Sequence, residues 1–187
     1  MTRHERLRAE LHAYDAADAA EERHRLAMVN LLTAADAFSR DHFVPGHFTA
    51  SCYIVDGAGR LLLHHHRRLD RWLQMGGHVE PDELPDAAAL REGREESGLG
   101  DLTLAARGIF DLDIHGIPPA RGEPGHDHFD VRYLARTVSA DSITMDRAES
   151  NELAWVTIDR AVELMPHPES HRVFRKIERL LRERRLP

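Results

Sequence analysis

Residues 77 to 99 place three carboxylates on one face of a short helix. A glycine turn at Gly77 precedes an alanine-rich segment in which Glu92, Glu95 and Glu96 follow the spacing i, i+3 and i+4. Because a helix advances about 100° per residue, these side chains span roughly 100° of its surface. Like charges on neighbouring turns weaken a helix. A bound divalent cation is the simplest compensation, since hard cations such as Mg²⁺ prefer carboxylate oxygens.

The whole segment matches the pattern G-x5-E-x7-R-E-U-x-E-E-x-G-U, in which U is aliphatic. Its fixed positions fall on Gly77, Glu83, Arg91, Glu92, Glu95, Glu96, Gly98 and Leu99. On these residues the chain resembles the Nudix hydrolase family, and flanking strand patterns extend the resemblance over residues 48 to 160. A solvated acidic helix paired with Arg91 and Arg94 is the alternative, and it is disfavoured because both glycines and Glu83 are also in register.

One position departs from the pattern, because Gly93 occupies the first aliphatic slot. Glycine inside a helix costs about 1 kcal/mol relative to alanine and leaves a gap. We expect a larger neighbour to fill that gap, or the helix and sheet backbones to approach more closely.

The resemblance implies a fold, a reaction and a cofactor. The fold is a Nudix-type α/β/α sandwich with a mixed sheet, and the reaction is hydrolysis of a diphosphate linkage in a nucleoside diphosphate derivative. The cofactor is Mg²⁺, with Mn²⁺ as a substitute. The implied metal ligands are box carboxylates and one backbone carbonyl: Glu92, Glu95, Glu96, the carbonyl of Gly76, and Glu83 through water. Glu83 reaching to Arg91 is the other option, and Arg91 is expected to orient a glutamate.

The catalytic base of this family often lies outside the box. Glu149 and Glu152 precede Trp155, close to where a family acidic residue often enters from a loop. Each is therefore a candidate for the base or for a further metal ligand. A carboxylate at a strand edge is the alternative for Glu152.

Histidine is abundant, with 14 in the chain. His64 and His66 end a predicted strand and should share one face, with His65 on the other. They are candidates for phosphate contacts, as is His78 in the box loop, although surface histidines are the simpler explanation for the run. Asp130 and Arg132 share a strand face and are expected to line the pocket. Three further histidines flank a Pro/Gly-rich linker and suggest a transition-metal site, an ordinary hydrogen-bonded cluster or a substrate-contact loop: His115, His126 and His128.

The 187 residues suit one domain with an appended element. We expect a helical extension over residues 1–44, with Asp15 capping its second helix, and the catalytic domain over 45–187. Strands are predicted at 48–55, 60–66, 72–75, 102–115, 128–137 and 152–157. Helices are predicted at 85–97 and 169–184, with a loop at 116–127.

Composition limits the partners. Charged residues make up 30% and hydrophobic residues 42% of the chain, which is typical of a soluble globular protein. The net charge of −7 disfavours binding to nucleic acid. No long apolar stretch or signal core is visible, so a cytoplasmic protein without a membrane partner is expected. The basic residues of the last helix are expected to form a solvated face, and the N-terminal arm is a candidate homodimer interface.

Two other functions are consistent with the same pattern. An isopentenyl diphosphate isomerase-like enzyme would need an active-site cysteine, and Cys52 is the only cysteine. Its apolar neighbours predict a buried side chain instead. A module that binds a nucleotide derivative without turnover is disfavoured because every box glutamate is present. The sequence does not identify the substrate.

Overall fold

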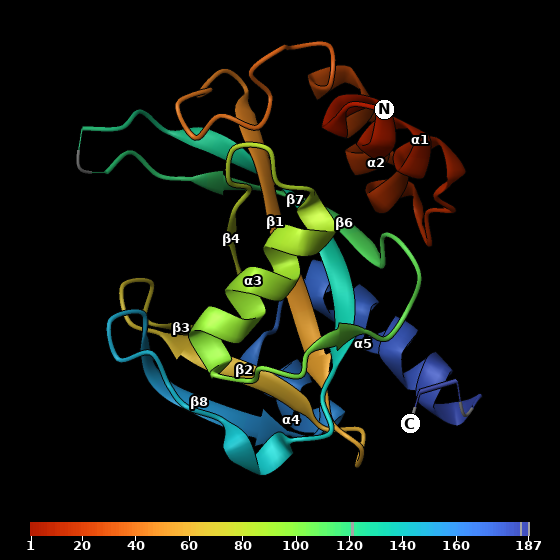
Figure 1. Ribbon diagram of the computed structural model, residues 1–187, viewed down its shortest axis with the longest axis vertical. Coiled ribbons are helices and arrows are strands. Elements are labelled where there is room, and N and C mark those ends of the chain that lie inside the picture. Colours follow the sequence, from red (N-terminus) through yellow and green to blue (C-terminus); the bar gives the residue numbers. More distant parts are fainter. Residues whose placement is uncertain (121, 184, 187) are drawn as a thin grey trace.

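The computed structural model describes residues 1–120, 122–183 and 185–186 (Figure 1). The elements follow the order α1 (Arg3–Ala13), α2 (Ala19–Leu31), β1 (Gly46–Val55), β2 (Leu61–His66), β3 (Arg71–Leu73), β4 (Met75–His78), α3 (Pro85–Ser97), β5 (Thr103–Leu104), β6 (Asp111–Ile117), β7 (His126–Arg136), β8 (Ser150–Val156), α4 (Ile158–Leu164) and α5 (Pro168–Arg182). A short 3-10 helix, Ala140–Ser142, precedes β8.

Strand β1 is the centre of a mixed sheet. It pairs in parallel with β7 along its whole length, from Gly46 opposite Asp127 to Val55 opposite Arg136. Its other edge is shared, because β4 pairs antiparallel with Thr49–Cys52 while β2 pairs only with the last two residues of β1. Beyond that point β2 leaves β1 and pairs with β3 and β8. The sheet therefore divides along one edge of β1.

Helices cover both faces of this sheet, as a sandwich fold requires. On one face α3 crosses β1 (Figure 1), and Ala88 and Ala89 share an apolar cluster with Cys52 and Ile54. On the other face α5 packs Phe174 against Tyr53, with ring centroids 6.1 Å apart. The expected mixed α/β sandwich is confirmed.

The N-terminal helices pack on the sheet and on α3. Leu7, Leu11 and Met28 are fully buried in the same cluster as Phe48 of β1, and Arg6 pairs with Asp86 of α3 at 2.8 Å. The second helix begins at Asp18, whose carboxylate accepts hydrogen bonds from Ala20 and Glu21, so the prediction of Asp15 as its cap is wrong. The division of the chain at residue 44 stays a prediction, as does a dimer.

Helix α3 has the predicted bounds because both of its ends are specified locally. Pro85 occupies the first turn, where its missing N–H costs nothing, and Gly98 ends the helix in the left-handed conformation with φ +73°. Gly93 lies on the face toward the sheet. A methyl group there would stand 2.7 Å from the Cys52 sulfur and 3.0 Å from Leu102 Cδ1. Neighbouring side chains thus fill the space that the pattern normally gives to an aliphatic residue.

Several predicted elements differ from the structure. The predicted strand over 102–115 is two strands, β5 and β6, separated by turns, and the strand over 72–75 is divided at Gln74 into β3 and β4. Both hairpin strands enter the predicted loop, since β6 extends to Ile117 and β7 begins at His126. Helix α4 was not predicted. The last helix ends at Arg182, and Arg184 lies outside the described residues.

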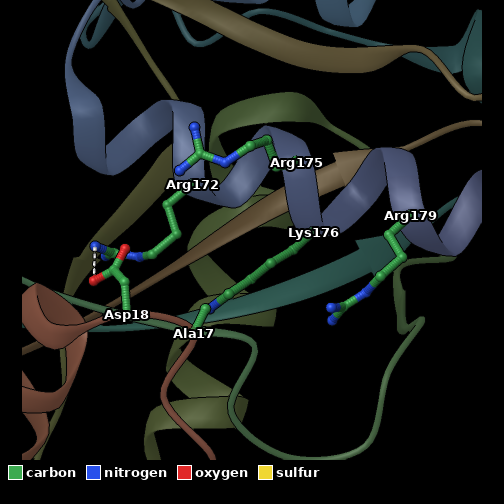
Figure 2. A pocket seen from close by; sticks show the side chains of 6 residues that line it. All are labelled: Ala17, Asp18, Arg172, Arg175, Lys176 and Arg179. Carbon is green, nitrogen blue, oxygen red and sulfur yellow. Dashed lines mark ion pairs between the residues drawn. The ribbon is translucent and has the colours of Figure 1, made fainter.

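The basic face expected on α5 is not fully solvated. Figure 2 shows that Arg172 and Lys176 extend beneath α5, and they are only 4% and 9% exposed. Arg172 donates to both oxygens of Asp111 at 2.8 and 2.9 Å. Lys176 donates to Asp111 at 2.8 Å and to Glu21 of α2 at 2.6 Å. These two cations are structural partners of buried carboxylates.

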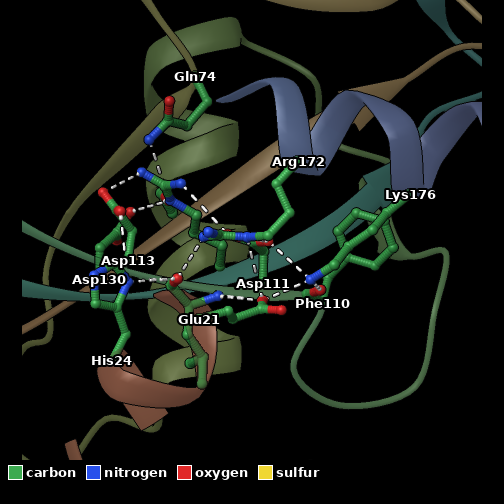
Figure 3. A network of polar contacts seen from close by, with 12 residues as sticks. Glu21, His24, Gln74, Phe110, Asp111, Asp113, Asp130, Arg172 and Lys176 are labelled. Atoms are coloured by element: carbon green, nitrogen blue, oxygen red, sulfur yellow. Dashed lines mark hydrogen bonds and ion pairs between the residues drawn. The ribbon is translucent and has the colours of Figure 1, made fainter. Parts of the chain in front are cut away.

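These pairs belong to a larger buried network (Figure 3). Arg132 of β7 contacts Asp130 at 2.9 Å, Asp113 at 2.7 Å and Asp111 at 3.5 Å. Burial acts to raise the pKa of Asp111, but the Arg172 hydrogen bond and the nearby cations outweigh it, so that the pKa is lowered. The network links α2, β6, β7 and α5 by charge as well as by apolar contact.

Removing Glu21 should test how much this network stabilises the fold. Glu21→Gln leaves Lys176 buried beside a neutral side chain, so the free energy of unfolding should fall by about 3–5 kcal/mol. Urea denaturation measures this. Glu22→Gln is the matched control, because the neighbouring Glu22 pairs with Arg25 at the surface and should change stability little. Equal effects of the two variants would show that the buried pair has no special role.

Gly93→Ala should be destabilising although alanine favours helices. The added methyl group overlaps the Cys52 sulfur, and overpacking of this kind typically costs about 1–3 kcal/mol. Cys52→Ala removes the sulfur, so the double variant should recover part of the loss. Denaturation of the two single variants and the double variant measures the coupling. Purely additive changes would contradict the contact.

Candidate active site

A cleft of about 1430 Å³ opens where β2 turns away from β1. Its walls come from β1, β2, β4, β6 and β7, from α3, and from the segments before β8 and α5. Thirteen predicted site residues line it: His64, His66, Gly76, His78, Glu92, Glu95, Glu96, Asp130, Arg132, Glu149, His115, His126 and His128. The sheet thus brings together groups from positions 64 to 149.

Two box glutamates are held against strand β4. Glu96 is only 7% exposed and accepts a hydrogen bond from the Gly76 N–H at 2.9 Å. The Glu92 carboxylate lies against Gly77, because a methyl group at that glycine would stand 2.5 Å from Glu92 Oε1. Gly77 therefore lets the Glu92 carboxylate approach the strand backbone, and Gly76 supplies the N–H that binds Glu96.

Arg91 organises the other side of the box. It donates to both oxygens of Glu83 at 3.1 Å and to the His78 carbonyl at 3.0 Å. One of its nitrogens also donates to Glu92 and Glu95, at 2.9 and 3.0 Å. Of the two options for Glu83, the structure contains the contact with Arg91. Arg91 itself contacts carboxylates, as expected of a residue that positions them.

Burial disfavours the charged form of the two inner glutamates. The pKa of Glu96 is raised to about 8, chiefly by burial and further by the charge of Glu92, while the Gly76 hydrogen bond opposes the change. The pKa of Glu92 is also raised by burial, with Arg91 acting in the opposite direction. A carboxylate with a strongly perturbed pKa inside a cleft is typical of a functional site.

The donor chemistry of this cluster fits a hard divalent cation. Glu92 and Glu96 present carboxylate oxygens to the cleft in a setting that lacks enough positive charge to compensate them. Glu95 also lines the cleft, but its side chain is 59% exposed and contacts Arg91. Glu92, Glu95 and Glu96 would hold the ion, and the roles of Glu83 and the Gly76 carbonyl in doing so stay predictions.

The floor of the cleft is formed by Asp130 and Arg132, both buried. Asp130 accepts hydrogen bonds from Thr49 at 3.2 Å and Ser51 at 2.8 Å. Arg132 donates to the same Asp130 carboxylate at 2.9 Å. They line the cleft as predicted, but their charges are largely neutralised within the network.

The histidines of β2 divide between two faces. His64 and His66 line the cleft, with ring centroids 5.6 Å apart, while His65 is not among its described lining residues and packs on Trp72. His64 is buried, contacts the Ser150 hydroxyl at 2.7 Å, and has its pKa lowered to about 4 by burial. The pKa of His78 is lowered by burial and by Arg40. These side chains therefore offer neutral hydrogen-bonding groups near neutral pH.

The two candidate bases have different positions. Glu149 lines the cleft and lies 3.9 Å from His66. Glu152 pairs in register with His65, the histidine on the other face, and is absent from the described residues that line the cleft. This position disfavours Glu152 as the base or a metal ligand, because alternate residues of a strand face opposite sides.

A second group of histidines lines the cleft beside His78. His47, His126 and His128 each offer one ring nitrogen, and these nitrogens lie within 4.8 Å of one another. The predicted member His115 instead contacts Asp113 at 3.1 Å. His47 was missed, because only the pairing of β1 with β7 places it opposite His128.

The geometry agrees with comparisons to known proteins. A family model described as the NUDIX domain matches residues 45–177. The mouse protein diphosphoinositol polyphosphate phosphohydrolase 3-alpha is 43% identical over 51 residues, which are 27% of this chain and 31% of the relative. The chain thus spans about a third of that relative's length.

Solved structures share the fold. A NUDIX-family hydrolase from Clostridium perfringens is 28% identical, with a TM-score of 0.53 over 72% of this chain and 97% of the other. A C. elegans Ap4A hydrolase, solved as a binary complex, has a TM-score of 0.59 at 22% identity over 73% and 98% of the two chains. At that identity the second likeness supports the fold alone.

The raised pKa of Glu96 predicts a pH-dependent stability in metal-free protein. The unfolded chain loses this proton near pH 4.5 and the folded chain near pH 8, so unfolding becomes easier as pH rises through that window. Glu96→Gln removes the effect, and its stability relative to wild type should rise by on the order of 3–5 kcal/mol between pH 4.5 and 8.

Urea denaturation in chelator at both pH values measures this difference. Glu95→Gln is the matched control on the same helix, because solvent already surrounds much of that carboxylate. A Glu96→Gln effect that does not change with pH would contradict the assigned burial.

Proposed function

The chain belongs to the Nudix family, and we propose that it is a Mg²⁺-dependent enzyme that hydrolyses a diphosphate linkage in a nucleoside diphosphate derivative. The observation that carries this proposal is the pair of desolvated carboxylates, Glu92 and Glu96, held against the Gly76–Gly77 backbone inside a large cleft. The size of the cleft suits a ligand with several groups. Mn²⁺ should substitute, since both cations favour oxygen donors.

The reaction needs positioning and charge neutralisation more than covalent help. A bound divalent cation supplies that neutralisation and polarises the phosphate oxygens. Glu92, Glu95 and Glu96 would hold it, and Arg91 orients Glu92 and Glu95 through its hydrogen bonds. Removing Arg91 should therefore weaken cation binding indirectly, through loss of carboxylate orientation.

Other residues of the cleft would bind the substrate and handle the proton. His64, His66 and His78 line the wall near the glutamates and would donate to phosphate oxygens. Glu149 is the preferred candidate for the base, because it lines the cleft beside His66 and has an exposed carboxylate. It would accept the proton of the attacking water, which adds to phosphorus as the bond to the leaving phosphate oxygen breaks.

Two features argue against the other functions. Cys52 is fully buried between β1 and α3, and burial raises the pKa of its thiol. It does not belong to the described lining of the cleft, which disfavours an isomerase that needs a cysteine in the site. A binding module without turnover is disfavoured because every box glutamate is present and three of them, Glu92, Glu95 and Glu96, line the cleft.

The cellular location of the protein stays a prediction from the sequence. Among the described residues, no helix is both long and apolar enough to cross a membrane. We propose a cytoplasmic enzyme that acts on a small molecule, and a homodimer stays a prediction.

Hydrolysis assays with the chain and Mg²⁺ test the proposal. A screen of nucleoside diphosphate derivatives, with phosphate released by a coupled phosphatase, should find one compound class that is cleaved. Glu96→Gln should lower kcat for that class by at least about 100-fold, because several kcal/mol of charge stabilisation are lost.

Glu152→Gln is the matched control, since this carboxylate lies on the other face of β8, and it should leave kcat within about twofold. Intact substrates throughout the screen, with tight binding of one of them, would replace the hydrolase by a binding module. Full activity of Glu96→Gln would contradict the assigned site.

A further inference from the structure

Three histidines that line the cleft form a compact group outside the box. His47 lies on β1 directly opposite His128 on β7, and His126 is two residues before His128 on the same face. The ring centroid of His47 lies 5.0 Å from that of His126 and 5.0 Å from that of His128, and the centroids of His126 and His128 are 5.2 Å apart. Paired strands fix all three backbones, so the grouping does not depend on a loop.

Hydrogen bonds fix the tautomers of two of these rings. His47 Nδ1 lies 3.3 Å from the His42 carbonyl oxygen, and His126 Nδ1 lies 2.9 Å from the Pro124 carbonyl oxygen. A carbonyl can only accept, so Nδ1 must be the protonated nitrogen in both rings. The lone pair of each Nε2 is therefore free. Metal-binding histidines commonly donate their other nitrogen to a carbonyl in this way.

One of these free nitrogens has no partner at all among the described residues. His47 is 1% exposed, and its Nε2 is buried without a hydrogen bond. A buried polar atom left unpaired costs about 1–3 kcal/mol, and such atoms are rare enough to need an explanation. A ligand that accepts the lone pair would remove this cost.

We propose that His47, His126 and His128 bind one divalent transition-metal ion, with Zn²⁺ as the best match, and leave a coordination position open to the cleft. Imidazole nitrogen suits Zn²⁺ and its neighbours in the transition series, whereas Mg²⁺ prefers oxygen. Zinc sites with three protein ligands keep a fourth position for water or substrate.

The spacing is compatible with such a site. Zn–N bonds of about 2.0–2.1 Å place tetrahedral ligands about 3.4 Å apart. The three nitrogens lie within 4.8 Å of one another, and rotation of the side chains can shorten the longer separations while the strands stay in place. His78 and His115 flank His128, with ring centroids at 5.5 and 5.6 Å.

The open position faces the same cleft as the box glutamates. An ion there would take an anionic oxygen from the part of the substrate that is remote from the cleaved bond. This role in substrate binding rests on the proposed function, but binding of the metal itself does not. The two sites differ in donor type, so each can be tested with its own cation.

Titration of metal-free full-length chain with Zn²⁺, followed by calorimetry, tests the inference. Wild type and Glu96→Gln should each bind one equivalent tightly. His128→Gln should weaken this binding by at least about tenfold. Loss of a residue that only supports a metal ligand already lowers affinity by about that factor, and a direct ligand should matter at least as much. His12→Gln is the matched control, because His12 is exposed on α1, and it should bind as wild type does.

Spectroscopy of wild type keeps the test independent of whether the variants fold. Co²⁺ should give the intense visible absorption of a tetrahedral site, and the X-ray absorption spectrum of the Zn²⁺ form should contain the outer-shell signature of three imidazoles. Unchanged Zn²⁺ affinity in folded His128→Gln, a carboxylate-only ligand shell, or the absence of Zn²⁺ binding to wild type would overturn the inference. None of these results decides whether the chain hydrolyses a substrate, so the metal site and the proposed function are tested independently.

Discussion

The pairing of strand β1 on both of its edges positions the rest of the molecule. Ten residues of β1 pair with β7 on one side, and β4 and β2 divide the other side between them. The point at which β2 leaves β1 opens the cleft, and β4 carries the glycines against which the carboxylates of α3 lie. The lack of a side chain at Gly93 lets α3 lie close to Cys52 of β1.

Buried charge connects the cleft to distant parts of the chain. Asp130 and Arg132 at its floor continue through Asp111 to Lys176 of α5 and Glu21 of α2 (Figure 3). Such pairs contribute little net stability when compared with apolar replacements, but they are costly to break. These ion pairs connect the N-terminal helices and α5 to the strands that line the site. Substitutions that break the pairs in α2 or α5 should therefore also perturb the cleft.

The sequence predicts best where the signals are local. The bounds of α3 follow from Pro85 and Gly98, and the roles of alternate residues in β2 follow from the two-residue repeat of a strand. Prediction failed where partners come from far along the chain. His47 has no local motif, and it joins the histidine group only because β1 pairs with β7.

The sequence also does not reveal which charged side chains are buried. Arg172 and Lys176 have the spacing of a solvated basic face, and only the positions of Asp111 and Glu21 reveal that they are internal partners. Glu152 and Glu149 are equivalent candidates in the sequence, and the register of β8 with β2 separates them. Contacts between segments distant in the sequence supply the information in both cases.

The central claim is that one cleft contains a carboxylate site for a hard cation beside the Gly76–Gly77 strand. Anomalous diffraction from a crystal grown with Mn²⁺ tests this most directly, because it locates the ion without reference to any substrate. The account predicts a Mn²⁺ peak within coordinating distance of the Glu92 and Glu96 carboxylates. A well-ordered cleft with no peak at these carboxylates, or with Mn²⁺ bound only elsewhere, would contradict it.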